Sequence, residues 1–229
     1  MLSKVNDDTS YEHLKELCEK RSSIRAFTDA RISDDVIAKI LSVAATSPYA
    51  SGKQNWEITV LQDREILRQM AEAVRKKSAD IIRHLDDEYA EGFRQYSSKF
   101  LFFENAPAVL VLSFRIQKSV SLMLNSALRP GADASPSPEA EEQRMKQEIT
   151  EWERDSFVKS ISCVAMLVLL AAESLGLGAC YMTGPLIAEK EIGEMLHLKK
   201  GRSIGAIIPV GYYPIPDKSE QKPNVNNEE

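Results

Sequence analysis

Two arginines and two serines near the start of the chain could bind a phosphate group. Arg21 and Arg25 are four residues apart and flank Ser22 and Ser23. Guanidinium groups bind phosphate through charge-assisted hydrogen bonds, and serine hydroxyls add further donors. A solvated basic patch is the alternative interpretation, because charged side chains are mostly exposed on protein surfaces.

A second segment, Ser47–Trp56, joins a predicted helix to a predicted strand through small and polar residues. Its backbone N–H groups and the Gln54 side chain could face a heterocyclic ligand. The alternative is an ordinary surface connection in which Trp56 anchors the loop in the core.

A third segment, Leu175–Pro185, contains Thr183 and Gly184. A glycine lets the backbone approach a planar ligand closely, although a plain turn between a helix and a strand would also explain the segment. The glycines at 176 and 178 do not complete a dinucleotide-binding G-x-G-x-x-G motif, because position 181 is Tyr181.

Composition argues against several other classes of protein. The 229 residues carry 29 Lys and Arg against 34 Asp and Glu, a net charge of −5 that does not favour a nucleic-acid-binding protein. The three cysteines are scattered and the three histidines form no metal-binding motif, so no metal site is predicted. Unpaired cysteines favour a cytoplasmic location, and Cys163 is predicted to pack rather than react.

The hydrophobic pattern predicts helices alternating with a few buried strands, an α/β or α+β sandwich. The apolar run from Ile161 to Ala172 is too short to span a membrane and predicts a central core helix instead. Helices are expected at 10–20, from about 33 to 45, from about 63 to 74, at 157–175 and at 189–196. Strands are expected at 56–61, 106–114, 178–182 and 204–210. We predict one domain, residues 1–229, with an insertion at about 117–155 that is either a solvated linker or a lid.

Together and in this order, the three segments resemble the FMN-dependent nitroreductase family. R-S-S-I-R-A-F is similar to the family's N-terminal phosphate-and-flavin segment, and L-G-L-G-A-C-Y-M-T-G-P resembles its flavin-edge loop. Gln54-Asn55-Trp56-Glu57 matches the family's Q-P-W-x position, with Asn55 in place of the usual proline. The resemblance covers residues 10–215 except for about 75–155.

The resemblance implies an α+β fold, a three-layer α-β-α sandwich that forms an intertwined homodimer with FMN at its interface. Arg21, Ser22 and Ser23 would then bind the FMN phosphate and ribityl chain. Arg25 would lie near the flavin pyrimidine, and backbone at Thr183 and Gly184 would face N5.

Other implied contacts come from the second subunit and from the C-terminal tail. The second subunit would line the flavin with Pro48, Tyr49, Ala50, Ser51 and Gln54. Lys222, or else Lys218, would complete the phosphate site.

The implied activity is that of an FMN-dependent oxidoreductase. It would use NAD(P)H to reduce nitroaromatic, quinone or related small-molecule acceptors by a ping-pong hydride mechanism, and no side chain is assigned as an acid or base. One alternative is a specialised FMN enzyme such as a reductive dehalogenase. Another is a non-catalytic interaction domain whose Arg21 and Arg25 dock an acidic partner. Neither nucleic acid nor membrane is an expected partner.

Overall fold

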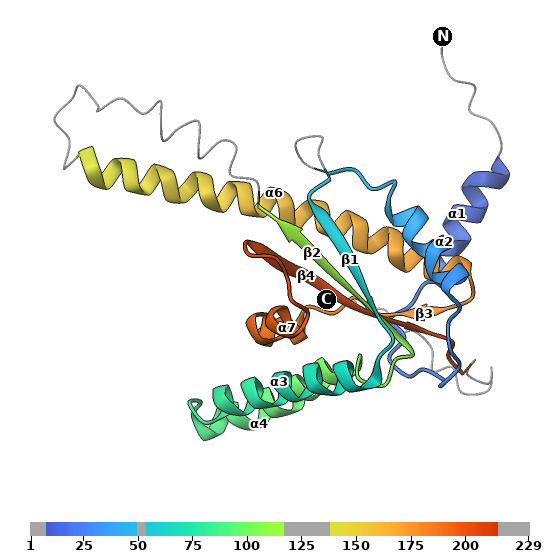
Figure 1. Cartoon of the computed structure of the whole chain (residues 1–229), viewed down its shortest axis with the longest axis horizontal. Coiled ribbons are helices and arrows are strands. Elements are labelled where there is room, and N and C mark those ends of the chain that lie inside the picture. Colours follow the sequence, from blue (N-terminus) through green and yellow to red (C-terminus); the bar gives the residue numbers. More distant parts are fainter. Residues whose placement is uncertain (1–7, 50–53, 117–137, 215–229) are drawn as a thin grey trace, which may run out of the picture.

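A computed structural model describes residues 8–49, 54–116 and 138–214. Four antiparallel strands form one sheet in the order β1-β2-β4-β3 (Figure 1). The strands are β1 (Trp56–Leu61), β2 (Ala108–Arg115), β3 (Gly178–Ala179) and β4 (Arg202–Gly211). All four lie where the sequence predicts strands, although β3 is only two residues long.

Helices cover both faces of the sheet, so the protein has the three layers of an α-β-α sandwich (Figure 1). The helices are α1 (Asp8–Lys20), α2 (Asp34–Ala44), α3 (Arg64–Ile82), α4 (Asp87–Ser98), α6 (Pro138–Ser174) and α7 (Glu189–Met195). Two short 3-10 helices are η2 (Lys99–Leu101) and η3 (Gly184–Ala188). The α+β prediction is therefore confirmed.

β2 is buried on both faces because its side chains alternate between two cores. Leu110 and Leu112 belong to the core shared with α2 and α6, whereas Val109 and Val111 belong to the core shared with α3 and α7. A strand between two helical layers presents successive side chains to opposite faces, and both faces must be mostly apolar.

The predicted helix boundaries follow from capping residues. Ser33 caps α2 by accepting a hydrogen bond from the Val36 N–H, and the Asp63 carboxylate caps α3 by accepting one from the Glu65 N–H at 2.8 Å. Gly176, two residues after the end of α6, adopts φ 72°, a left-handed conformation that glycine reaches at little cost.

α6 differs from the predicted core helix in length and in burial. It begins at Pro138 rather than near Phe157, within the region predicted to be an insertion, and its first half extends beyond the sheet (Figure 1). Its apolar second half buries only one face, so Met166 is 49% exposed and Cys163 is exposed. The prediction that Cys163 packs in the core is therefore wrong for the single chain. Residues 143–174 have the length and hydropathy of a membrane span, but core helices also meet that criterion, and this helix packs against the sheet.

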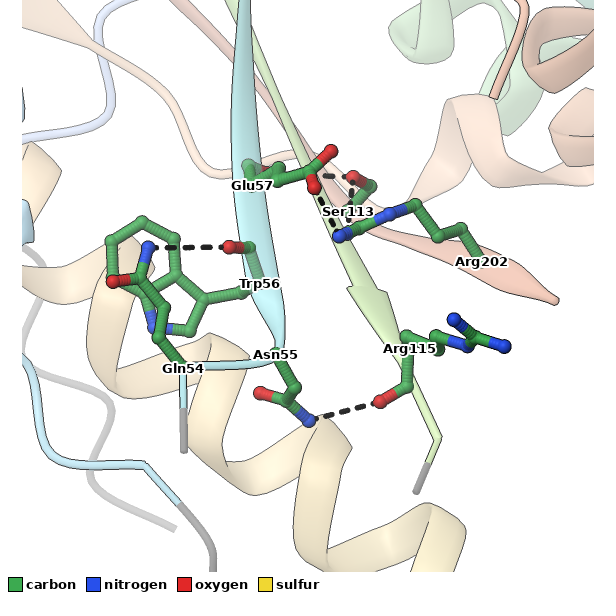
Figure 2. Close-up of polar contacts among 7 residues, drawn as sticks. All are labelled: Gln54, Asn55, Trp56, Glu57, Ser113, Arg115 and Arg202. Carbon is green, nitrogen blue, oxygen red and sulfur yellow. Dashed lines mark hydrogen bonds and ion pairs between the residues drawn. The ribbon is translucent and has the colours of Figure 1, made fainter. Parts of the chain in front are cut away.

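β4 contains a β-bulge near its first residues, opposite the end of β2. Leu112 pairs with Ala206 but Ser113 pairs with Ile204, so Gly205 has no partner on β2. The side chains of β4 before Gly205 therefore point to the opposite face of the sheet from the one that regular alternation would give. Beyond the bulge the Arg202 guanidinium forms an ion pair with Glu57 and donates to the Ser113 hydroxyl at 3.4 Å (Figure 2). These contacts tie β4 to β2 and β1.

Candidate functional site

The Arg21–Phe27 segment lies against β3, although more than 150 residues separate them in the sequence. Ser23 forms an isolated parallel bridge with Ala179, and the Ile24 N–H donates to the Ala179 carbonyl at 3.0 Å. A Cβ on Gly178 would lie 2.7 Å from Ile24 Cβ, so this close approach requires glycine. The fold thus joins the first predicted segment to the third.

A cavity of about 470 Å³ opens where these segments meet. Its lining includes three residues predicted to bind FMN: Arg25, Thr183 and Gly184. Pockets of 300–1,000 Å³ with a few convergent polar groups are typical of cofactor sites. This cavity is therefore the candidate site.

The guanidinium of Arg25 is held at the cavity by two neutral neighbours. Its Nη1 donates to the Ser23 carbonyl at 3.1 Å, and its Cζ lies 5.8 Å from the centre of the Phe102 ring. Among the described residues, no carboxylate pairs with Arg25. Its positive charge is therefore available to an anionic or electron-rich ligand.

Gly184 brings its backbone to the cavity beside an aromatic ring. A Cβ at this position would lie only 2.2 Å from Cδ1 of Phe100, so a side chain here would collide with the ring. Gly184 begins η3, and the N–H of the first residue of a helix has no acceptor within the helix; the next residue, Pro185, has no N–H. The backbone here can therefore donate to a planar ligand.

Cys180, a buried free cysteine, also lines the cavity. Burial raises the pKa of Cys180, and the nearby Arg25, Ser23 and Arg21 oppose that rise without cancelling it. The thiol is consequently protonated at neutral pH, which argues against a nucleophilic cysteine. The same electrostatic effects show that Arg21 and Ser23 lie near Cys180 at this end of the cavity, whereas Ser22 has no such effect on the thiol.

The second predicted segment lies elsewhere in the single chain. Pro48, Tyr49 and Gln54 are not among the residues that line the cavity. Tyr49 packs against the core of α2 and α6, and Gln54 lies beside Trp56, where its Nε2 is 3.4 Å from the Trp56 carbonyl (Figure 2). The four remaining predicted residues, Ala50, Ser51, Lys218 and Lys222, fall outside the described residues.

Asn55 has a structural role at the end of the sheet. Its Nδ2 donates to the Arg115 carbonyl at 3.0 Å, and its own carbonyl accepts from the Arg115 N–H at 2.9 Å (Figure 2). Proline has no side-chain amide to make the first of these bonds. At the position where the resemblance implies a proline, Asn55 therefore adds a side-chain hydrogen bond between the start of β1 and the end of β2.

One wall of the cavity was not predicted from the sequence. It consists of residues from α4, η2 and the turn that follows: Tyr96, Lys99, Phe100 and Phe102. All four belong to the stretch from 75 to 105, whose charged and aromatic residues show no clear periodicity. The aromatic run K-F-L-F-F, a few residues before a buried strand, is the one signal that could have indicated this wall.

A larger cavity, of about 750 Å³, lies around α7 and the loop that follows it. None of the predicted site residues lines it, and its lysines alternate with Glu189 and Glu194. Over the described parts of the chain, no three His, Cys, Asp or Glu side chains gather closely enough to hold a metal ion.

Comparison with known proteins identifies the class. The chain belongs to the Nitroreductase family, which it matches over residues 18–212. A putative NADH dehydrogenase/NAD(P)H nitroreductase of Archaeoglobus fulgidus is 47% identical over 53 residues, which are 23% of this chain and only 30% of that protein. An iodotyrosine deiodinase of Nematostella vectensis is 21% identical over 212 residues, covering 90% of this chain and 68% of that protein.

Solved structures share the fold at low sequence identity. A BluB-like flavoprotein from Clostridium difficile 630 has a TM-score of 0.74 at 23% identity, covering 91% of this chain and 94% of that one. A nitroreductase with bound FMN from Desulfitobacterium hafniense DCB-2 has a TM-score of 0.60 at 16% identity, covering 91% and 96%. These similarities concern the fold.

Proposed function

We propose that the protein is a homodimeric, FMN-dependent oxidoreductase that uses NAD(P)H to reduce nitroaromatic, quinone or related acceptors. The observation that carries the proposal is the cavity in which Arg25 meets the Thr183–Gly184 backbone, in a chain of the Nitroreductase family. The names of two relatives, one with bound FMN and one an NAD(P)H nitroreductase, support the choice of cofactor and electron donor.

The residues at the cavity fit FMN. Arg25 offers a guanidinium with no carboxylate partner among the described residues, the backbone N–H of Gly184 offers a donor, and Phe100 and Phe102 offer apolar surface. FMN, when bound, supplies the hydride chemistry. Arg25 would favour negative charge on the pyrimidine side, and the Gly184 backbone would fix the orientation of the ring by hydrogen bonding.

A second copy of the chain would complete the site. The single chain leaves apolar side chains exposed on α6 and α1, among them Met166 at 49% and Leu14 at 53%. Exposed apolar patches mark interaction surfaces. Pairing through these helices would bury them, and it would account for the absence of Pro48, Tyr49 and Gln54 from the cavity of their own chain.

The test is the flavin content of the purified protein. We expect a yellow protein that releases FMN on denaturation and oxidises NADH or NADPH in the presence of menadione or 4-nitrobenzamide. Arg25→Ala should weaken FMN binding about 10- to 100-fold, the range for a hydrogen bond to a charged group. Arg64→Ala, which removes a surface partner of Asp29, is the matched control and should bind FMN normally. A colourless protein that does not bind added FMN would rule out the proposal.

Reductive dehalogenation is a second candidate, favoured by the similarity to iodotyrosine deiodinase along most of the chain. It predicts release of iodide from an iodinated phenol when the protein is supplied with a reductant. Comparison of that rate with the rate of nitroaromatic reduction would distinguish the two activities.

A further inference from the structure

The wall made by α4 and η2 carries one cation that the proposed FMN site does not use. Arg25 and Lys99 are the two cationic residues at the cavity, and no Asp or Glu lines it. Arg25 is assigned to the flavin in the proposed function, where its guanidinium is positioned by the Ser23 carbonyl and the Phe102 ring. Lys99 forms no ion pair or side-chain hydrogen bond with another described residue. Its ammonium group therefore adds an uncompensated positive charge to the cavity.

Packing holds Lys99 at this place. The next residue, Phe100, is buried and lies so close to Gly184 that a Cβ there would be 2.2 Å from the ring. Tyr96 meets Phe100 edge to face, with ring centres 5.0 Å apart and planes at 81°. The backbone of η2 is thus packed against the loop that contains Gly184, and the exposed Lys99 side chain extends from it.

Exposed aromatic rings lie beside this charge. Tyr96 is 59% exposed and Tyr181 is 39% exposed, and both line the cavity. Tyrosine supplies flat apolar surface for a ligand ring at low entropic cost. A cavity with aromatic surfaces, a lysine and no acid is complementary to an aromatic ring that carries a negative group.

We infer that Lys99 determines specificity by binding the anionic group of an aromatic acceptor, so that the enzyme prefers arylcarboxylates to their neutral analogues. This inference rests on the proposed function, because it names the substrate class of the same site. Lys99 is exposed to solvent, so the preference is modest, about fivefold, as expected for an exposed ion pair.

The test compares 4-nitrobenzoate with 4-nitrobenzamide, which differ in charge but share the ring and the nitro group. Lys99→Gln should lower kcat/KM for 4-nitrobenzoate about fivefold and leave that for 4-nitrobenzamide unchanged, and Lys99→Arg should retain the preference. Lys39→Gln, on α2 at the opposite face of the sheet, is the matched control. Equal losses for both acceptors, or loss of bound FMN from Lys99→Gln, would overturn the inference.

A binding measurement separates this inference from the proposed function. The ¹⁹F NMR line of 4-fluorobenzoate should broaden on addition of the wild-type protein more than that of 4-fluorobenzamide, and the difference should vanish in Lys99→Gln. If no nitro compound is reduced but this difference is present, the proposed function fails and the charge recognition stands. If reduction occurs and wild type and variant bind both probes alike, Lys99 has no role in specificity.

Discussion

The contact between Gly184 and Phe100 gives the sharpest prediction about the site. A Cβ at position 184 would lie 2.2, 2.5 and 2.8 Å from Cδ1, Cε1 and Cγ of the Phe100 ring. Carbon atoms prefer separations of about 3.5–4.0 Å, so the ring would have to move by about 1.3 Å or more. Phe100 is buried, and the ring therefore has little room to move.

Gly184→Ala should therefore destabilise the protein by about 1–3 kcal/mol, the usual cost of overpacking. For a chain of this size that cost corresponds to a fall in Tm of roughly 2–4 °C per kcal/mol. Urea unfolding followed by circular dichroism measures the loss. FMN binding should weaken as well, because the displaced ring and backbone line the cavity.

Two further variants separate the clash from other effects of the substitution. In a Phe100→Ala background the ring is gone, so Gly184→Ala should cost almost nothing, and the two substitutions should be coupled by about 1–3 kcal/mol. Gly92→Ala is the matched control, because nothing lies within 4 Å of a Cβ there, and alanine within α4 should stabilise by about 0.5–1 kcal/mol. If Gly184→Ala costs the same with and without the Phe100 ring, the reasoning is refuted.

Three other predictions concern separate parts of the chain. Asn55→Ala should cost about 1 kcal/mol in urea unfolding, because the buried Asn55 side chain loses its hydrogen bond to the Arg115 carbonyl at the junction of β1 and β2; an unchanged midpoint would contradict the role of the amide. Burial raises the pKa of Cys180, so the folded protein holds the thiol proton more tightly than the unfolded chain does. The resulting contribution to the free energy of unfolding is fully present below the pKa of the unfolded thiol, about 8.5. It is lost as the pH rises through the folded-state pKa, because the folded protein must then ionise a buried thiol. Wild type should therefore lose stability relative to Cys180→Ala between pH 8 and pH 10, and parallel pH profiles would disprove this. Cys163 is exposed in the single chain, so dimerisation through α6 should make its alkylation slow at high protein concentration and fast on dilution, whereas a rate independent of concentration would argue against that interface.

The helices and strands that could be predicted from the sequence are those whose local pattern of apolar and capping residues matches their burial in the fold. β2 is apolar at nearly every position, and a strand between two helical layers buries both faces, so its identity could be inferred directly. Ser33 and Asp63 marked helix starts because their side chains cap the backbone. The first half of α6 was missed because it is acidic and has little apolar periodicity, so nothing distinguished it from a solvated linker.

The candidate site could be predicted only in part. Arg25, Thr183 and Gly184 were found from short motifs, because each combines a residue type with a backbone requirement. The wall formed by Tyr96, Phe100 and their neighbours depends on how η2 packs against Gly184, a tertiary contact that has no local sequence pattern. Burial on α6 was overestimated because the apolar pattern does not tell a face packed in the core from an exposed face.

A crystal structure of the protein with added FMN tests the central claim most directly. The account predicts the isoalloxazine ring beside the Arg25 guanidinium and the Gly184 backbone, with the Pro48–Gln54 loop of a second chain on the same ring. FMN bound around α7, or a site formed by one chain alone, would contradict it.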